Sequence, residues 1–383
     1  MVSLIKNVRI IGPDRIVEGQ QLIIEDGYIK GLTCQSTQVG FDQLIDGAGL
    51  FLAPGFIDIH SHGNSGYDVM DASKKALDAM GDYHISKGVT SYLASIITAS
   101  KEDMLRAAKM VADYKNSPGR AELLGIHLEG PFFRKEKKGA QPEEHLIKPD
   151  KLFIEELLDL AGNKLRMVSL APELEGSLEL IDYLRARGVK VGLGHSQASY
   201  NQALDAIDRG ASIATHLYNG MGPFDHREPG LVGACLTDDR VYCELIYDRI
   251  HVHDAAASLA IKAKGSDGVI LISDAMMAAG LEDGSYLLGG QEVFVKDGVP
   301  RLASGALGGS TLNLQRAVQN SHKYLDMPIV EAIKMASLNP ARALDFYELG
   351  SIEAGKKADF LFLDEDLNIK RVYKAGVLAY EEK

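Results

Sequence analysis

The sequence contains few cysteines, no tryptophan and no long apolar run. Its cysteines, Cys34, Cys235 and Cys243, form no CxxC pair and are too few for a disulfide framework, so we expect buried free thiols. No apolar stretch is long enough for a signal-sequence core or a membrane span. The absence of tryptophan excludes no class of protein. The small number of cysteines argues against a disulfide-rich secreted domain, and the lack of a long apolar run argues against a membrane protein. We expect a cytoplasmic protein.

Blocks of positive charge are also absent. The chain carries 41 Lys and Arg against 53 Asp and Glu, a formal net charge of -12, with no lysine or arginine run. This balance argues against nucleic acid or an anionic membrane as a partner. An anionic small-molecule substrate would need a local positive pocket.

The chain has 383 residues, whereas a (β/α)8 barrel takes roughly 250. Residues 1–52 and 348–383 both show short alternating strands with turn signals, so the two termini are predicted to form a small β-sandwich domain together. Residues 53–347 are predicted to form the barrel. Helical patterns over 74–88, 177–188 and 199–210, each closed by a glycine, would cover it.

Eight apolar, strand-like runs occur between the terminal segments, which is the βα rhythm of a parallel sheet. They cover residues 55–60, 90–97, 122–129, 166–173, 189–195, 212–219, 241–248 and 268–275. Eight strands with covering helices favour a closed TIM-like barrel of the α/β class, and a doubly wound open sheet is the alternative.

Polar residues stand at the ends of these runs, where barrel enzymes place their active sites. The predicted metal-binding residues are His60, His62, Glu129, His195, His216 and Asp274, and His251 follows the seventh run. A single His-x-His pair is a weak motif. Six such residues at one end of a barrel are a much stronger signal, because buried carboxylates are costly unless they are paired or bound to a metal.

The ligand types suit one or two divalent ions, with Zn, Fe, Mn and Co all possible. The absence of cysteine from the set argues against a structural zinc site. Such an ion would lower the pKa of a bound water toward about 7 and polarise the carbonyl under attack. Asp274 is the predicted general base and acid, and a role as a plain metal ligand is compatible with this.

The sequence resembles the amidohydrolase superfamily over its whole length. The resemblance lies in PGFIDIHSHG (54–63), in the two later single histidines, in Asp274 and in the closing segment from Ala336 to Asp364. In one branch of the superfamily, a carboxylated lysine at the end of strand four bridges the metals. The sequence fits that branch less well, because its fourth run, 166–173, ends in Glu173.

Within the superfamily, seven ordered motifs resemble the sugar-phosphate deacetylases that act on N-acetylglucosamine 6-phosphate. These are HLEGPFF, KKGAQ, GLGHS, THLYNGM, HREPG, ISDAM and GGST, between residues 127 and 311. The resemblance implies one metal site at Glu129, His195 and His216, and a second completed by His60 and His62. It also implies Asp274 as the catalytic acid and base.

The same resemblance implies a phosphorylated N-acetyl amino sugar as substrate, amino-sugar catabolism and cell-wall recycling as the role, and a homodimer in which a neighbouring subunit helps bind phosphate. Its implied substrate-binding residues are Gln141, Asn219, Gly220, Arg227, His251 and Leu307. By spacing alone, Arg227 could instead pair with Glu228 or another surface acid. Two different functions also remain open, an N-acyl amidohydrolase of another kind, such as an N-acyl amino acid deacylase, and a non-catalytic sugar-phosphate-binding protein.

Overall fold

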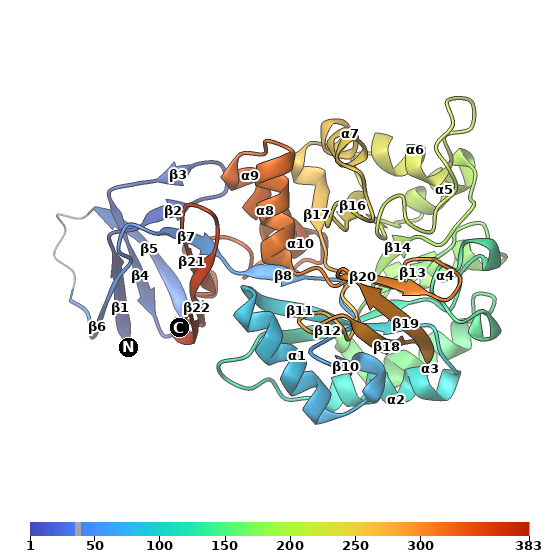
Figure 1. Ribbon diagram of the computed structural model, residues 1–383, viewed down its shortest axis with the longest axis horizontal. Helices are drawn as coiled ribbons and strands as arrows, with labels where there is room; N and C mark the ends of the chain where they lie inside the picture. Colours follow the sequence, from blue (N-terminus) through green and yellow to red (C-terminus); the bar gives the residue numbers. More distant parts are fainter. Residues whose placement is uncertain (35–39, 383) are drawn as a thin grey trace.

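The structure is a computed structural model that describes residues 1–34 and 40–382. At its centre, eight parallel strands follow one another around a nearly closed barrel (Figure 1). They are β8 (Phe56–Asp58), β11 (Val89–Ile97), β12 (Glu122–Glu129), β13 (Leu165–Leu170), β14 (Lys190–Leu193), β15 (Ile213–Ala214), β16 (Tyr242–Leu245) and β17 (Val269–Leu271). Just beyond β8 and β17, a bridge between Ser61 and Ala275 joins the two ends of the sheet. The predicted barrel is confirmed.

The strands are buried on both faces, as a barrel requires when side chains fill its interior and helices cover its outside. All nine residues of β11, VTSYLASII, are buried. Each predicted run overlaps one barrel strand, but several strands are shorter than predicted. The strand β15, for example, keeps only Ile213 and Ala214 of the run 212–219.

Helices surround the barrel (Figure 1). They are α1 (Lys74–Ser86), α2 (Lys101–Asp113), α3 (Lys151–Ala161), α4 (Ser177–Arg185), α5 (Tyr200–Asp208), α6 (Gly230–Thr237), α7 (Asp254–Lys264), α8 (Leu314–Tyr324), α9 (Ile329–Met335) and α10 (Leu338–Ala343). The three predicted helices are α1, α4 and α5. Serine side chains cap two of them, Ser73 on α1 and Ser199 on α5, by accepting hydrogen bonds from first-turn amides.

Both chain ends lie in a separate β region (Figure 1). One sheet has the order β5-β4-β1-β6 and the other β23-β22-β21-β7-β2-β3. The strands are β1 (Val2–Lys6), β2 (Arg9–Ile11), β3 (Ile16–Val17), β4 (Gln20–Glu25), β5 (Tyr28–Cys34), β6 (Gln43–Asp46), β7 (Phe51–Pro54), β21 (Phe360–Leu363), β22 (Ile369–Lys374) and β23 (Val377–Glu381). The C-terminal β21 pairs antiparallel with the N-terminal β7. The domain boundaries at 52/53 and 347/348 stay a prediction.

A three-stranded antiparallel sheet, which was not predicted from the sequence, follows the last barrel strand. It consists of β18 (Gly284–Leu288), β19 (Gln291–Lys296) and β20 (Val299–Leu302). Its buried Leu288, Val293 and Val295 pack with Ile97, the last residue of β11, and with Met276. The sheet therefore covers part of the carboxyl-terminal end of the barrel.

The cysteines agree only in part with the prediction. All three are free; Cys235 and Cys243 are buried, but Cys34, the last residue of β5, is exposed. The expectation of a buried thiol was therefore wrong for Cys34. Among the described residues, no helix is both long and apolar enough to cross a membrane.

Candidate metal centre and active-site pocket

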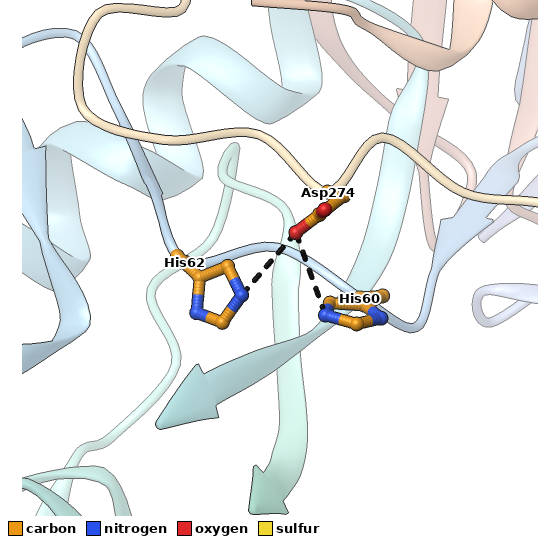
Figure 2. Close-up of side chains that lie close together, drawn as sticks. All are labelled: His60, His62 and Asp274. Atoms are coloured by element: carbon orange, nitrogen blue, oxygen red, sulfur yellow. Dashed lines mark ion pairs between the residues drawn. The ribbon is translucent and has the colours of Figure 1, made fainter. Parts of the chain in front are cut away.

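The six predicted ligands meet at the carboxyl ends of the barrel strands, and all are buried. They form two groups, one of His60, His62 and Asp274 and one of Glu129, His195 and His216, in each of which the possible ligand atoms lie within 4.8 Å of one another. In the first group, the carboxylate of Asp274 points at both histidine rings (Figure 2). Its Oδ1 lies 3.3 Å from Nε2 of His62 and 3.5 Å from Nε2 of His60.

Three of these residues stand at sharp backbone turns just after their strands. The φ angles are 47° at His195, 34° at His216 and 47° at Asp274. A left-handed conformation is costly for residues other than glycine, on the order of 1 kcal/mol each, and such residues gather at functional sites. The turns end the strands early and direct these side chains toward the centre of the barrel.

Hydrogen bonds on the far side of three imidazoles fix their orientation. Nδ1 of His62 donates to Ser95 O at 3.1 Å. Nδ1 of His195 donates to Lys137 O at 2.8 Å, and Nδ1 of His216 donates to Asn219 O at 3.1 Å. A carbonyl oxygen can only accept, so Nδ1 carries the proton in each neutral ring. The Nε2 lone pairs are therefore left facing the site, as metal ligation requires.

Glu129 lies between the two groups. Its Oε1 is 3.0 Å from Nε2 of His216 and 3.3 Å from Nε2 of His195. Its Oε2 is 3.2 Å from Nε2 of His62 and accepts a hydrogen bond of 2.6 Å from Nε2 of Gln141. Oε1 is also 3.5 Å from Nε2 of His60, so the carboxylate of Glu129 contacts histidines of both groups, as a bridging ligand would.

The electrostatics of the cluster favour a cation. Burial alone would lower the pKa of His60, but Asp274 and Glu244 raise it to about 9. Burial likewise opposes ionisation of Glu129, yet the neighbouring imidazoles of His195 and His216 hold its pKa well below the ordinary range. The carboxylates therefore create a strongly negative potential at the imidazoles.

The donor set also fits a divalent ion. Nε2 of His195 and Nε2 of His216 are 3.0 Å apart, and Nε2 of His60 is buried without a hydrogen-bond partner among the described residues. The Nε2 lone pairs of His195 and His216 both point toward the same space beside the carboxylate of Glu129. They repel each other unless a cation or a proton lies between them. The residues present therefore fit an imidazole- and carboxylate-bound metal.

The cluster opens into a cavity of about 260 Å³. The polar lining includes His62, Glu129, Asn219, His251 and Asp274, and the apolar lining includes Ile97, Leu288, Ala306 and Leu307. Leu288 belongs to β18, so the unpredicted sheet forms part of the wall.

Five of the six predicted substrate-binding residues line this cavity. They are Gln141, Asn219, Gly220, His251 and Leu307. The ring of His251 is held by Asp248, whose Oδ2 lies 2.6 Å from Nδ1. Burial pushes the pKa of Asp248 upward, but the hydrogen bond and charge of His251 lower it below its ordinary value.

Gln141 is less free than a sugar contact would require. Its Nε2 donates to Glu129, as above, and its Oε1 accepts from the amide of Thr98 at 3.0 Å. The side chain is only 2% exposed. Its hydrogen-bonding groups therefore hold the carboxylate of Glu129 in place.

Arg227, by contrast, does not line the cavity. It is exposed, in the loop 222–229 before α6, near the exposed Phe224. No ion pair joins it to Glu228 or to another acid in the part of the chain that the structure describes, and its backbone amide donates to Asp225 Oδ1 at 2.8 Å. The surface pairing considered from spacing is therefore absent from the described residues.

Glu244 in β16 was not among the residues predicted from the sequence. This carboxylate is fully buried, and its Oε2 lies 3.1 Å from Nδ1 of His60. A signal was present, since Glu244 is an acid inside the apolar run VYCELI. Its place within the run, rather than at the end, hid it among the strand residues.

A (β/α)8 barrel with a buried cluster of histidines and carboxylates at the carboxyl ends of its strands is typical of metal-dependent hydrolases. The model of the amidohydrolase family matches residues 51–379, so the chain belongs to the amidohydrolase family.

Particular relatives within the family are similar along nearly their whole length. An N-acetylglucosamine-6-phosphate deacetylase of Lysinibacillus sphaericus is 39% identical, over 97% of this chain and 96% of the relative. An N-acetylgalactosamine-6-phosphate deacetylase of Escherichia coli O157:H7 is 40% identical, over 99% of this chain and all of the relative.

Solved structures agree with these relatives. The N-acetylglucosamine-6-phosphate deacetylase of Mycobacterium smegmatis, a mutant in complex with N-acetyl-D-glucosamine-6-phosphate, superposes with a TM-score of 0.92 at 32% identity, covering 99% of both chains. The deacetylase of Thermotoga maritima gives 0.90 at 36% identity, over 99% of this chain and 100% of the other. An enamidase at 18% identity and a TM-score of 0.67, covering 100% of this chain and 96% of the other, shares the fold.

Proposed function

We propose that this chain hydrolyses N-acetylglucosamine 6-phosphate to glucosamine 6-phosphate and acetate. The observation that carries the proposal is Asp274, which faces two histidines and lines a cavity of substrate size. The high similarity to deacetylases of phosphorylated N-acetyl amino sugars supports the substrate class. The reaction would serve amino-sugar catabolism and cell-wall recycling, in the cytoplasm.

The proposed metal ligands are the two groups described above. Glu129, His195 and His216 would hold one ion, and His60, His62 and Asp274 would complete a second site. Zn, Fe, Mn and Co all suit these donors, and one or two ions per chain can be accommodated. When bound, a divalent ion supplies a Lewis acid that activates water and polarises the acetamide carbonyl.

Asp274 would move the proton. Its carboxylate accepts a proton from the attacking water as the new carbon–oxygen bond forms. It then gives that proton to the sugar nitrogen as the carbon–nitrogen bond breaks, which releases acetate and the amine. Histidines on one side of Asp274 and the open cavity on the other support this role.

The remaining cavity residues would bind the substrate. His251 and the backbone amide of Gly220 would bind the phosphate, since polarised N–H groups suit an anion. Asn219 would line this part of the site, because its side-chain amide donates to His216 O and Leu217 O. Leu307 would contact the acetyl methyl. Gln141 would contribute to the sugar site mainly as part of its wall, because its amide is engaged elsewhere.

Arg227 would complete the phosphate site of a neighbouring subunit in a homodimer. Its exposure, its absence from the lining of its own cavity and its lack of an ion-pair partner among the described residues support this placement. A guanidinium fork matches phosphate geometry well.

A second substrate, N-acetylgalactosamine 6-phosphate, is favoured by one specific observation, namely the relative of that name at 40% identity. The two sugars differ only in the configuration of one ring hydroxyl. Steady-state kinetics of the metal-loaded protein on both compounds distinguishes the two substrates. We expect the higher kcat/KM for the glucosamine derivative; a higher value for the galactosamine derivative would reverse the assignment.

The same assay, extended to N-acetylated amino acids, tests the two rival functions. An N-acyl amino acid deacylase would hydrolyse these compounds and ignore the sugar phosphates. A non-catalytic binding protein would bind the sugar phosphate without releasing acetate. Either result would overturn the proposed function.

A further inference from the structure

Glu244 occupies an unusual position beneath the metal centre. It lies in β16, its side chain is fully buried, and its Oε2 contacts both ligand groups. On one side Oε2 is 3.1 Å from Nδ1 of His60, and on the other it accepts a hydrogen bond of 3.0 Å from the backbone amide of His216. One oxygen thus supports a histidine ring of the first group and the backbone of the second.

His60 differs from the other three histidines in this contact. His62, His195 and His216 each donate from Nδ1 to a neutral backbone carbonyl, whereas Nδ1 of His60 faces a carboxylate. A carboxylate accepting from Nδ1 places the neutral ring's proton there, which leaves the Nε2 lone pair toward the metal site and makes it a stronger donor. Nε2 of His60 has no hydrogen-bond partner among the described residues.

The surroundings of Glu244 also call for a positive charge. Its Oε1 is buried and without a hydrogen-bond partner within the described chain. An ionised carboxylate that is fully buried is costly unless a cation offsets it. The ring of His60, which Glu244 contacts through Nδ1, would bring the positive charge of a bound ion close to this carboxylate.

We infer that Glu244 is a positioning residue that fixes His60 for metal binding and links the two ligand groups through the backbone of His216. This inference rests on the proposed metal-dependent function. A carboxylate that only helped the barrel to fold could satisfy the His216 amide without lying in line with an imidazole ring. The alignment with Nδ1 of His60 is what a purely structural role leaves unexplained.

The test is ion affinity, measured without substrate. Metal-free wild-type protein and Glu244→Gln are titrated with Zn²⁺, and bound ions per chain are counted together with the dissociation constant of each site. We expect Glu244→Gln to weaken one ion by about 10- to 100-fold, the usual effect of removing a partner of a metal-bound histidine. In a His60→Gln background, Glu244→Gln should add little, because both changes act on the same site.

Glu122→Gln is the matched control. It makes the same chemical change at the first residue of β12, at the opposite end of the barrel from the ligands, and should lower the melting temperature without changing Zn²⁺ affinity. Equal Zn²⁺ affinities of Glu244→Gln and wild type, or additive losses with His60→Gln, would overturn the inference. Wild-type protein that binds no Zn²⁺ would instead overturn the proposed function on which the inference rests.

Discussion

Asp274 faces both the histidines of its group and the open cavity, and its left-handed backbone holds it there. Ser310 N donates to its carbonyl at 2.7 Å, and its own amide donates to His60 O at 2.9 Å. These bonds fix the turn that a φ of 47° makes costly. The position of the carboxylate is therefore set before substrate enters.

Asp274→Asn removes the proposed proton carrier while keeping the size of the side chain. We expect kcat to fall by about 10²- to 10⁴-fold, the usual contribution of general acid–base catalysis. Binding of N-acetylglucosamine 6-phosphate, measured by calorimetry, should change far less. A variant with wild-type kcat would refute the proposed role.

Much of the site could be predicted residue by residue. His195 ends its apolar run, Asp274 is next to last in the eighth run and His216 lies within the sixth, and polar residues toward that end of a barrel strand indicate an active site. Glu244 could not be recognised in the same way because it lies inside its strand, and its importance comes from the ring that it faces. The engagement of Gln141 with Glu129 is likewise a contact across two segments that spacing does not reveal.

At the scale of elements, the apolar runs located every barrel strand but overestimated several lengths. In the fifth and sixth runs, β14 and β15 stop before the histidines because the chain turns there into the left-handed region. The sheet β18 to β20 was not predicted although residues 284–302 alternate around Gly-Gly and Asp-Gly turns, a hairpin signal. It is an addition to the barrel, which eight strands already complete.

A network of charged side chains joins the barrel strand β12 to the terminal β region. Glu122 accepts from Lys374 at 2.7 Å and from Lys357 at 3.3 Å, and Lys374 also donates to Asp359 at 2.6 Å. Burial raises the pKa of Glu122, but the two lysines lower it more, so its pKa in the folded protein lies below the ordinary 4.5. The ionised carboxylate is the form that stabilises the fold.

A lowered folded-state pKa means that Glu122 contributes fully at a pH above 4.5, and that this contribution is lost as the pH falls through the lower value. We expect Glu122→Gln to lower the free energy of unfolding by about 1–2 kcal/mol at pH 7, between the effects of exposed and buried ion pairs. Denaturant unfolding at several pH values measures this difference. It should shrink below pH 4.5, and a difference that is constant with pH would contradict the role of the charge.

At the scale of the whole molecule, the association of the two termini was predictable. Both segments alternate and carry turn signals. In the structure β21 and β7 pair within one sheet, and the two terminal sheets share a core that includes Leu22, Leu52 and Phe360. The location of Arg227 relative to the proposed phosphate site was not predictable, because a single sequence does not show which surfaces of two copies would meet. The proposed homodimer therefore needs its own test.

Arg227→Ala should raise KM for N-acetylglucosamine 6-phosphate by about 10- to 100-fold, the loss expected for a charge-assisted hydrogen bond. Mixing this variant with Asp274→Asn and allowing subunits to exchange tests whether Arg227 acts on a neighbour. In each mixed dimer, one site would have its own Asp274 and receive Arg227 from the other subunit. We expect about a quarter of wild-type activity from an equal random mixture. No recovery despite confirmed exchange would place Arg227 in its own subunit's site.

The central claim is that this chain is a metal-dependent deacetylase of N-acetylglucosamine 6-phosphate. The most direct measurement follows release of glucosamine 6-phosphate by protein stripped of metal with a chelator and then resupplied with Zn²⁺, Fe²⁺, Mn²⁺ or Co²⁺. We predict no release from the stripped protein and recovery with one or two equivalents of at least one ion. Undiminished release after the metal has been removed, or no release with any of these ions, would contradict the account.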